Sequence, residues 1–295
     1  MQGRSSVSVL LPTRRGGALC EQVIRRVREQ RTERPVEVVA VDSGSSPDEL
    51  AAMKRAGARV ESIDPASFDH GLTRDLAAQR STGDLLVFLN QDALPVGDDW
   101  LEQLLAPFDS ADPPAAVQGA IHEFPLAELA ARGRRRFFWE SCGARFYFTG
   151  ESREWIGRNG GIGFSTVHCA IARTAWQAVP FGPAAILEDK RWQAAAIARG
   201  MRIDTAPEAV VWHTHDYGLR DLARRCASEG YGWRGVGVRY RWRDAWRDVR
   251  RAADWPEWRR GLRSGEMRRL GEVLFPLVRP LALWWGSRWG RRSWC

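Results

Sequence analysis

The sequence predicts an α/β fold in which a mostly parallel sheet is covered by helices. Strand-like apolar runs alternate with helical patterns through the first 121 residues. The runs are continuously apolar, as is typical of strands that are buried on both faces. With 295 residues, of which 44% are hydrophobic and 27% charged, the chain can bury a large core. Together these observations place the chain in the α/β class.

The predicted strands are short runs rich in valine, isoleucine and leucine. The first stops at Pro12, whose ring cannot donate to a strand ladder. The segments are Ser5–Leu11, Val36–Val41, Ala58–Ile63, Asp84–Leu89, Ala116–Ile121 and Ala209–Trp212.

Helical spacing or helix-start signals fill the intervals between these strands. Apolar residues recur at helical spacing in Leu19–Gln30. Ser46 is a typical N-cap, because a proline and two acidic residues follow it at the positive end of the helix dipole. Further helices are predicted at Gly71–Ser81, Asp98–Phe108 and Leu187–Arg199, the last of which stops at Gly200.

Polar side chains follow three of the predicted strands at the point where each ends. The run VFLNQDALP, for example, passes from buried apolar residues directly to Asn90, Gln91 and Asp92. Pro12-Thr13-Arg14 and Asp42-Ser43-Gly44 follow two other strands in the same way. Ligands of open α/β sheets bind beyond the carboxyl ends of the strands. A single such carboxylate is often only a loop cap, but three polar strand ends together predict a ligand site.

The net charge of +8 is concentrated at the C-terminal end of the chain. Residues 220–295 hold nineteen arginines, no lysine and eight acidic residues, a net charge of +11. Nine of the fifteen tryptophans lie in residues 231–295. We therefore expect a main domain at 1–220 and a basic extension at 221–295.

The cysteines and the N-terminus predict a reduced, cytoplasmic chain. The five cysteines are odd in number and show no CxxC spacing, so buried thiols are the simplest interpretation. The N-terminus has no apolar region of secretory length. No stretch is long and apolar enough to span a bilayer.

Five segments in order resemble a glycosyltransferase of family 2, which has the Rossmann-like GT-A fold. They are SVLLPT, VVAVDSGS, FDHGLTRDLAAQRSTGDLLVFLNQDALP, AILEDKRWQAAAIARG and VVWHTHDY. Within that family the chain most resembles bacterial rhamnosyltransferases of surface-polysaccharide synthesis. The resemblance implies an inverting enzyme that moves a sugar, L-rhamnose from dTDP-rhamnose as the best match, to a hydroxyl of a glycan or lipid-linked acceptor. It also implies that residues 1–220 form the catalytic domain, with a nucleotide-sugar half at about 1–122 and an acceptor half at about 123–220.

The resemblance also implies a divalent cation, Mn²⁺ or Mg²⁺, on the diphosphate of the donor, which is a dTDP- or UDP-sugar. Asp92 resembles the last aspartate of the family's DxD motif, and His213 is the second expected ligand. Asn90 departs from the motif, because it brings no charge to the first position. His215 is a further candidate, since alternate residues of an extended segment share one face. Two histidines alone would suggest zinc, but no third ligand is spaced to complete such a site.

Glu188 and Asp189 resemble the family's Glu-Asp motif. The resemblance implies that Asp189 is the general base and that Glu188 orients the sugar or the acceptor. A positioned carboxylate that takes the acceptor proton typically contributes about 10²–10⁴ in rate. Without the resemblance, the two acids would be explained by their place at a helix N-terminus. His168 stands where relatives often carry an amide near the acceptor, and it is a weaker candidate.

The donor nucleotide sugar is expected at the three polar strand ends and at one arginine. Asp42 resembles the residue that accepts a hydrogen bond from the nucleobase, although uracil, thymine and guanine all offer an N–H there. The neighbouring residues expected in the same site are Pro12, Thr13, Ser43, Gly44, Asn90 and Gln91. Arg74 is the expected diphosphate contact, because a guanidinium pairs with phosphate bidentately; the alternative is a helix-surface residue.

The tryptophans and arginines of 231–295 suggest peripheral attachment to the inner face of the membrane, where both side chains suit the headgroup region. Packing on the catalytic domain or on a second subunit is the alternative. Nucleic acid is a less favoured partner.

Two other functions stay open at this point: a nucleotidyltransferase that activates a sugar phosphate, and a non-catalytic basic RNA-binding protein.

Overall fold

The computed structural model describes residues 4–140, 150–215, 217–250 and 255–290. By spatial contacts the chain divides into two compact units. The sheet unit comprises Met1–His122, Ile162–Ala184 and Glu188–His213. The helical unit comprises Glu123–Gly161, Ala185–Leu187 and Thr214–Cys295. Residues 123–161, which the sequence suggested as part of an acceptor half, thus group with the C-terminal helices.

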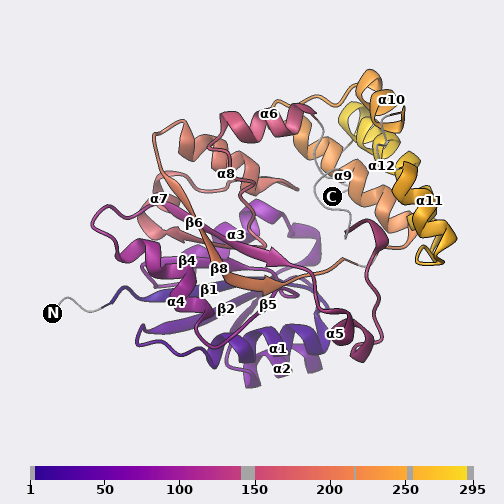
Figure 1. Ribbon diagram of the computed structural model, residues 1–295. Helices are drawn as coiled ribbons and strands as arrows, with labels where there is room; N and C mark the ends of the chain where they lie inside the picture. Colours follow the sequence, from indigo (N-terminus) through magenta and orange to yellow (C-terminus); the bar gives the residue numbers. More distant parts are fainter. Residues whose placement is uncertain (1–3, 141–149, 216, 251–254, 291–295) are drawn as a thin grey trace. The chain divides into compact units, whose positions relative to one another are not determined.

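In its described residues the sheet unit holds one eight-stranded sheet with the strand order β3-β2-β1-β4-β7-β6-β8-β5 (Figure 1). The strands are β1 (Val7–Thr13), β2 (Val36–Asp42), β3 (Arg59–Ser62), β4 (Leu85–Leu89), β5 (Leu94–Pro95), β6 (Ala116–His122), β7 (His168–Ala172) and β8 (Ile203–Trp212).

Parallel pairing dominates the first half of the sheet and mixed pairing the second. β1 pairs in parallel with β2 and β4, and β2 pairs in parallel with β3. β7 enters antiparallel between β4 and β6, and β5 is antiparallel to β8. β6 and β8 are parallel. The predicted α/β class with a mostly parallel sheet is confirmed, and the antiparallel pairs come from two strands that the sequence did not reveal.

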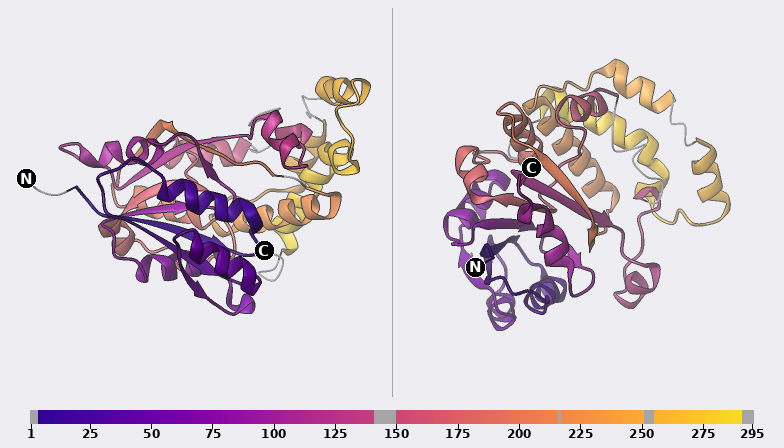
Figure 2. Two further views of the ribbon diagram at one scale, coloured as in Figure 1. Left: turned by 90° about the horizontal axis from the view of Figure 1, so that it is seen from below. Right: turned by 60° about the vertical axis from the view of Figure 1, so that its left-hand side comes forward.

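Helices cover both faces of this sheet. They are α1 (Gly17–Arg28), α2 (Pro47–Arg55), α3 (His70–Gln79), α4 (Trp100–Leu105), α7 (Arg173–Ala178) and α8 (Glu188–Ile197), with 3₁₀ turns at Pro65–Ser67 and Ala106–Asp109. Figures 1 and 2 show α1 and α2 on one face and α3 on the other. The predicted start of α2 is confirmed, because Ser46 and Glu49 form a reciprocal capping box.

The core follows the two-residue period of the strands. Leu10, Val39 and Phe88 pack on one face with Ala77 of α3 and Trp192 of α8. Their neighbours along the strands point to the opposite face and are also buried, as in Val9, Leu11, Val38, Ala40 and Val87. Burial on both faces explains why these strands are continuously apolar.

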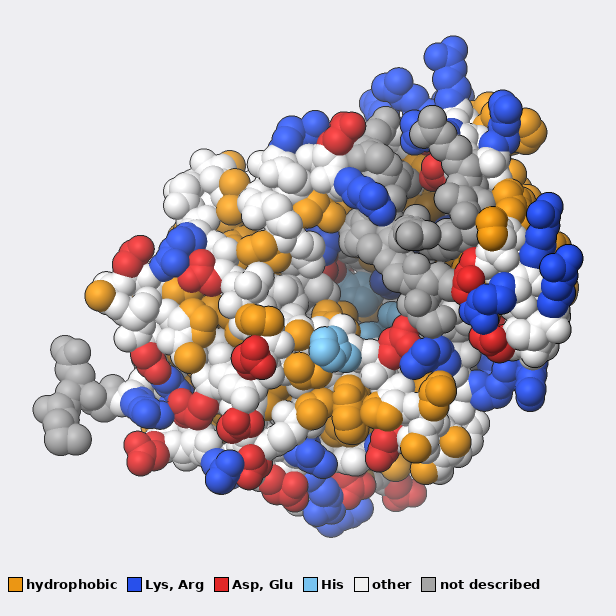
Figure 3. All heavy atoms as spheres, viewed as in Figure 1, with side chains coloured by type: hydrophobic (Ala, Val, Ile, Leu, Met, Phe, Trp, Pro, Cys, Tyr) orange, Lys and Arg blue, Asp and Glu red, His pale blue; other side chains and the backbone are white. Residues whose placement is uncertain are grey.

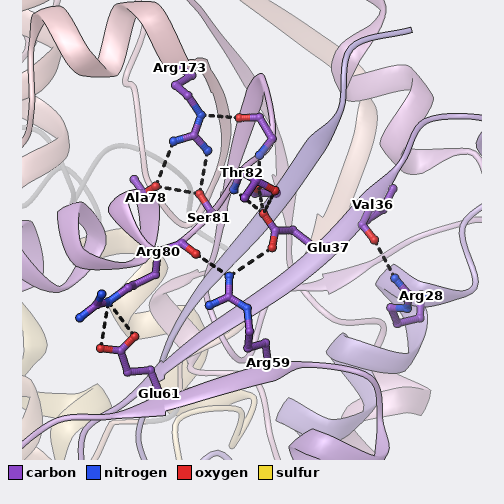
Figure 4. A network of polar contacts seen from close by, with 12 residues as sticks. Arg28, Val36, Glu37, Arg59, Glu61, Ala78, Arg80, Ser81, Thr82 and Arg173 are labelled. Carbon is purple, nitrogen blue, oxygen red and sulfur yellow. Dashed lines mark hydrogen bonds and ion pairs between the residues drawn. The ribbon is translucent and has the colours of Figure 1, made fainter. Parts of the chain in front are cut away.

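A polar network ties the amino ends of the strands together (Figure 4). Glu37 of β2 accepts hydrogen bonds from the hydroxyl groups of Ser8 and Thr82 and from Arg59. Arg173 donates to the carbonyls of Ala78 and Gly83 and to the Ser81 hydroxyl. This edge of the sheet is therefore held by structural contacts, whereas the carboxyl edge carries the polar residues singled out from the sequence.

The helical unit has its own core. Its elements are α5 (Leu126–Ala131), a 3₁₀ turn (Phe138–Glu140), α6 (Gly150–Arg158), α9 (Leu219–Gly235), α10 (Trp242–Arg250), α11 (Trp255–Arg263) and α12 (Leu270–Trp289). Phe137 and Trp139 pack on Phe275 of α12, at ring-centroid distances of 5.5 and 5.4 Å. The buried Glu272 carboxylate accepts from the backbone N–H groups of Phe138 and Arg269. None of the described helices is long and apolar enough to cross a membrane.

The tryptophans of 231–295 divide between core and surface. Trp233 is buried, whereas Trp242, Trp246, Trp285 and Trp289 are each about half exposed. Among the cysteines, Cys20, Cys169 and Cys226 are buried thiols. Trp294, Cys142 and Cys295 lie outside the described residues.

Candidate active site

Thr13 and Asp42 lie side by side at the carboxyl ends of β1 and β2, because the parallel register pairs them. One Asp42 oxygen accepts from the Thr13 and Ser45 hydroxyls at 3.0 and 2.6 Å. The other accepts from the backbone N–H groups of Gly44 and Ser45, both at 2.9 Å. Burial alone would raise the pKa of Asp42, but these hydrogen bonds lower it below its usual value. Asp42 is thus an ionised, buried carboxylate that orders its loop.

All four acceptor positions of Asp42 are taken by protein donors. A nucleobase N–H reaching this carboxylate would therefore replace a hydroxyl donor, which can rotate away, more readily than a backbone donor. Ser43 is also buried, and its backbone N–H donates to the Thr13 carbonyl at 2.9 Å. Gly44 has φ +118°, a conformation that favours glycine. Pro12 precedes this pair in β1, opposite Val41.

Gln91 ties the end of β4 to the loop after β1. Its side-chain oxygen accepts from the Arg14 N–H at 2.8 Å, and its amide donates back to the Arg14 carbonyl at 3.1 Å. Gly16 lies so close that an added Cβ would come within 2.7 Å of the Gln91 oxygen. Arg15, which lies between Arg14 and Gly16, has φ +47°, a backbone conformation that costs energy in any residue but glycine. Two of the predicted polar strand ends are therefore joined directly.

Arg74 of α3 connects two further motifs. One of its guanidinium nitrogens lies 3.2 Å from the Glu188 carboxylate, and the other donates to the Asn90 side-chain oxygen at 3.1 Å. The first also donates to the His70 carbonyl at 3.2 Å. Arg74 is only 4% exposed, so protein groups surround its charge. The structure thus brings Arg74, Asn90 and Glu188 together, although they are far apart in the sequence.

Glu188 and Asp189 open α8 with opposite pKa shifts. Burial would raise the pKa of Glu188, but Arg74 and a 2.8 Å hydrogen bond from the Thr166 hydroxyl hold it below its usual value. Burial raises the pKa of Asp189, and the neighbouring Glu188 charge adds to this. The Asp189 side chain keeps 13% of its surface exposed. One carboxylate is therefore fixed as an anion, and the other holds a more basic, partly accessible oxygen.

The contacts around Asp189 fix its carboxylate at the start of the helix. One oxygen accepts from the Lys190 N–H at 2.7 Å, and the other lies 3.6 Å from the Lys190 ammonium. That ammonium also donates to the Phe164 carbonyl. Leu187, directly before the motif, has φ +56°, which is rare for a residue with a branched side chain. The turn into the Glu-Asp motif is therefore strained.

Asp92 and His213 meet next to this group. β5 and β8 pair Leu94 with Trp212, which places the residues just outside the two strands side by side. Nδ1 of His213 lies 3.4 Å from an Asp92 oxygen. The Asp92 side chain is 38% exposed, whereas that of His213 is 6% exposed. The described residues contain no cluster of three or more His, Cys, Asp or Glu side chains placed to hold a metal.

His168 and His215 make contacts of other kinds. His168 is fully buried; the Trp100 indole N–H donates to its Nε2 at 2.8 Å, and its Nδ1 lies 3.2 Å from the Ala120 carbonyl. A neutral ring protonated at Nδ1 satisfies both contacts. Burial lowers the pKa of His168 to about 3. The suggestion that His168 lies near the acceptor is therefore replaced by a structural role. His215 belongs to the helical unit, where its ring stacks on Tyr217 at 5.0 Å.

Sequence reasoning missed three residues that hold candidate side chains in place. Thr166 binds Glu188, Lys190 contacts Asp189, and Trp100 fixes His168. Thr166 and Trp100 are 22 and 68 residues from their partners in the sequence, whereas Lys190 directly follows Asp189. Only Lys190 carried a usable signal, because a cation directly after two acids on a helix invites a local ion pair.

Comparisons with known proteins identify the family and the fold. The profile of the family described as Glycosyl transferase family 2 matches residues 8–177. The O-antigen chain rhamnosyltransferase RfbN of Salmonella typhimurium is 28% identical over 234 residues, which cover 76% of this chain and 71% of the relative. The O-antigen chain rhamnosyltransferase WbaN of Salmonella anatum is 26% identical over 231 residues, with the same coverage.

Two solved structures illustrate the likeness in fold. Glucosyl-3-phosphoglycerate synthase from Mycobacterium tuberculosis, in complex with phosphoglyceric acid, has a TM-score of 0.59 and 17% identity, covering 79% of this chain and 81% of that one. Mannosyltransferase PcManGT from Pyrobaculum calidifontis, in complex with GDP-Man and Mn²⁺, has a TM-score of 0.55 and 18% identity, covering 97% and 73%. The expected GT-A fold is thereby confirmed. Because the family profile spans more than half of the chain, the protein belongs to glycosyltransferase family 2.

Proposed function

We propose that the protein is an inverting rhamnosyltransferase that uses a nucleotide-diphosphate sugar and a glycan or lipid-linked acceptor. The observation that carries the proposal is the Arg74 network, which joins the Glu-Asp motif of α8 to the strand end at Asn90. A donor diphosphate at the strand ends and a base at α8 would thereby face one reacting sugar. Family membership favours glycosyl transfer over the nucleotidyltransferase and RNA-binding alternatives.

Asp92 and His213 would hold a divalent cation. The Asp92 carboxylate oxygen and the His213 nitrogen, 3.4 Å apart, fit two coordination positions around one ion. Because Asp92 is partly exposed, phosphate oxygens and water could fill the remaining coordination positions. Asn90 is a poorer ligand, because its side-chain oxygen already accepts from Arg74. Related folds were crystallised with Mn²⁺ or Mg²⁺ and UDP. When bound, such an ion would neutralise the charge of the leaving diphosphate.

Asp189 would act as the general base. Its carboxylate is held by the Lys190 N–H and keeps an accessible edge, as a group that must meet an acceptor hydroxyl requires. A raised pKa makes its oxygen a stronger base once it is deprotonated. Glu188 and Arg74 are then positioning residues, because they form an ion pair with each other. Glu188 also accepts a hydrogen bond from Thr166, and Arg74 donates one to Asn90. A single displacement with one base inverts the anomeric centre.

The choice of rhamnose as the transferred sugar is supported by the two O-antigen rhamnosyltransferase relatives. The dTDP carrier is part of our proposal. The fold does not decide the nucleotide, because the similar structures carry UDP in one case and GDP-Man in another. In this chain Thr13, Asp42 and the loop after it would receive the base, whichever it is.

The deciding experiment is a donor panel with product analysis. Thermal unfolding is followed with dTDP-, UDP- and GDP-sugars, with and without manganese, and the released nucleotide is identified after turnover. We expect dTDP-rhamnose to give the largest stabilisation and dTDP to be released. Release of inorganic diphosphate instead would identify a nucleotidyltransferase, and a larger response to another sugar would overturn the rhamnose assignment.

We also propose that the helical unit makes peripheral contact with a membrane surface. The exposed tryptophans of α10 and α12 and the arginines of α10 to α12 support this. Such a contact would bring the enzyme to a lipid-linked acceptor.

A further inference from the structure

The helical unit contains a pocket of about 520 Å³. It is formed by the end of α9, the segment that leads into α10, and the last turns of α12. The residues that line it are Arg234, Arg239, Tyr240, Arg241, Trp242, Trp284, Ser287 and Arg288. Four of these eight residues are arginines, and none is acidic. The lining therefore favours an anionic occupant.

The arginine charges are not neutralised by described carboxylates. Arg234 donates to the carbonyls of Ser287, Arg288 and Gly290 at 3.4, 3.3 and 3.1 Å, and these acceptors carry no net charge. In the part of the chain that the structure describes, the exposed side chains of Arg239, Arg241 and Arg288 form no ion pair. The pocket thus keeps its positive charge.

The two acidic residues of α10 are engaged in contacts within the protein. Asp244 accepts from the Arg241 backbone N–H at 2.8 Å and pairs with Arg247 at 3.0 Å. Asp248 accepts from the Tyr240 hydroxyl at 2.6 Å. Both carboxylates therefore serve to anchor α10, and an incoming anion would meet the guanidinium groups without competition from them.

An apolar surface continues from the wall of the pocket. Trp242 and Trp284 touch at 5.0 Å between ring centroids, and Trp284 in turn touches Trp289 at 5.0 Å. Trp242 and Trp289 are 49% and 44% exposed. Leu277, Leu281 and Trp285 recur every four residues along α12 and are also exposed. In Figure 3 blue arginine and orange hydrophobic side chains are interspersed over these helices.

We propose that this pocket binds the phosphate of an anionic phospholipid headgroup, while the exposed tryptophans and leucines enter the membrane interface. Guanidinium groups pair bidentately with phosphate oxygens, and tryptophan prefers the interfacial region of a bilayer. A free phosphate ester would use the arginines but not the apolar surface. Single-stranded RNA would use the arginines and tryptophans, but not the leucine stripe. This inference rests on the proposed membrane contact and assigns its binding site.

The test is sedimentation with vesicles of phosphatidylcholine, alone or with about 30% phosphatidylglycerol. The pocket variant carries Arg239→Gln, Arg241→Gln and Arg288→Gln. The matched control carries Arg220→Gln, Arg259→Gln and Arg263→Gln, which removes the same charge from exposed helix positions of the same unit away from the pocket. We expect binding to anionic vesicles to fall at least about tenfold in the pocket variant and by less than about threefold in the control.

Each outcome bears on the proposal. Equal losses in both variants would show a diffuse charge effect and would overturn the pocket, while leaving the membrane contact in place. Absence of vesicle binding by the wild-type protein would overturn both. Glycerol 3-phosphate and a short single-stranded RNA serve as competitors: tight binding of either without vesicle binding would identify a soluble phosphate or nucleic-acid site instead. Donor-induced thermal stabilisation, which we assign to residues of the sheet unit, should be unchanged in both variants, so that its loss would signal misfolding.

Discussion

Asp92 is the residue on which the proposed metal site depends most, because it supplies the only negative charge of the Asp92–His213 pair. Replacing it with alanine should abolish the manganese-dependent part of the thermal stabilisation by nucleoside diphosphates, while leaving any metal-independent part. Asp98→Ala, which removes a carboxylate paired with Arg31 on the surface, is the control. Retained manganese dependence in Asp92→Ala would remove Asp92 from the site.

Protonation of Asp189 should determine how turnover falls at low pH. Its pKa is raised by burial, so the basic form is lost as pH falls through that raised value, at a higher pH than for an ordinary aspartate. Asp189→Asn should lower kcat at least about a hundredfold with donor binding intact. Asp48→Asn, at the exposed start of α2, should behave as wild type. Wild-type turnover by Asp189→Asn would exclude it as the base.

Arg74 and Glu188 form a buried ion pair, 5% and 6% exposed in their side chains. Arg74→Met leaves an uncompensated buried carboxylate and should lower the free energy of unfolding by about 3 kcal/mol. Adding Glu188→Gln to this variant should recover part of the loss, because the charge is then gone. Urea unfolding measures both.

The contrasting control for this pair is Arg80→Met. Its partner Glu61 lies 3.0 Å away on the surface, where solvent screens the interaction, so the change should stay below about 1 kcal/mol. An equally small effect of Arg74→Met would show that Arg74 does not hold the site together.

At the scale of elements, Glu37 links β1, β2 and β3 at the amino edge of the sheet (Figure 4). Burial would raise its pKa, but hydrogen bonds from Thr82, Ser8 and Arg59 lower it to about 2. A depressed pKa stabilises the fold above the unfolded value of 4.5, and this contribution is lost as pH falls toward 2. Glu37→Gln should therefore cost about 1 kcal/mol at pH 7 and less at pH 3 in urea unfolding. A difference that does not change with pH would contradict the network.

The packing of α9 on α12 depends on a close approach at Gly286. A Cβ added there would come within 1.8 Å of the Ala227 carbonyl oxygen, so the helices would have to separate. Gly286→Ala should lower the free energy of unfolding by at least about 1 kcal/mol, as seen in thermal unfolding by circular dichroism. Gly235→Ala, where an added Cβ meets nothing within 4 Å, is the matched control. Equal stability of the two variants would show that the helices can adjust.

The elements that sequence reasoning found were those with strong local signals. β1, β2 and β4 are continuous apolar runs, and α2 begins at a capping box. β7 was missed because its sequence, HCAIA, is short and has little β-branched content. β5 has only two residues and exists because β8 pairs with it. The antiparallel part of the sheet therefore depended on tertiary contacts that no local pattern records.

For the molecule as a whole, composition located the basic extension but not the limits of the compact units. Phe137 and Trp139 complete the core around Phe275, more than 130 residues further along the chain. Nothing local distinguishes such aromatics from those of the sheet unit. The candidate site residues stand in recognisable motifs after strand ends and on α3 and α8, so the sequence could name them, and their roles stay predictions. The burial of His168 could not be predicted in this way, since burial is a property of the fold and not of the residue.

The contacts of Arg74 also determine when the site can exist during synthesis or refolding. Arg74, Asn90 and Glu188 can make contact only once nearly two hundred residues are present and folded, and His213, the partner of Asp92, follows later still in the chain. No fragment that ends before this point carries the full set of groups. Recovered catalytic activity should therefore report the last steps in the assembly of the sheet unit, after most of its secondary structure has returned.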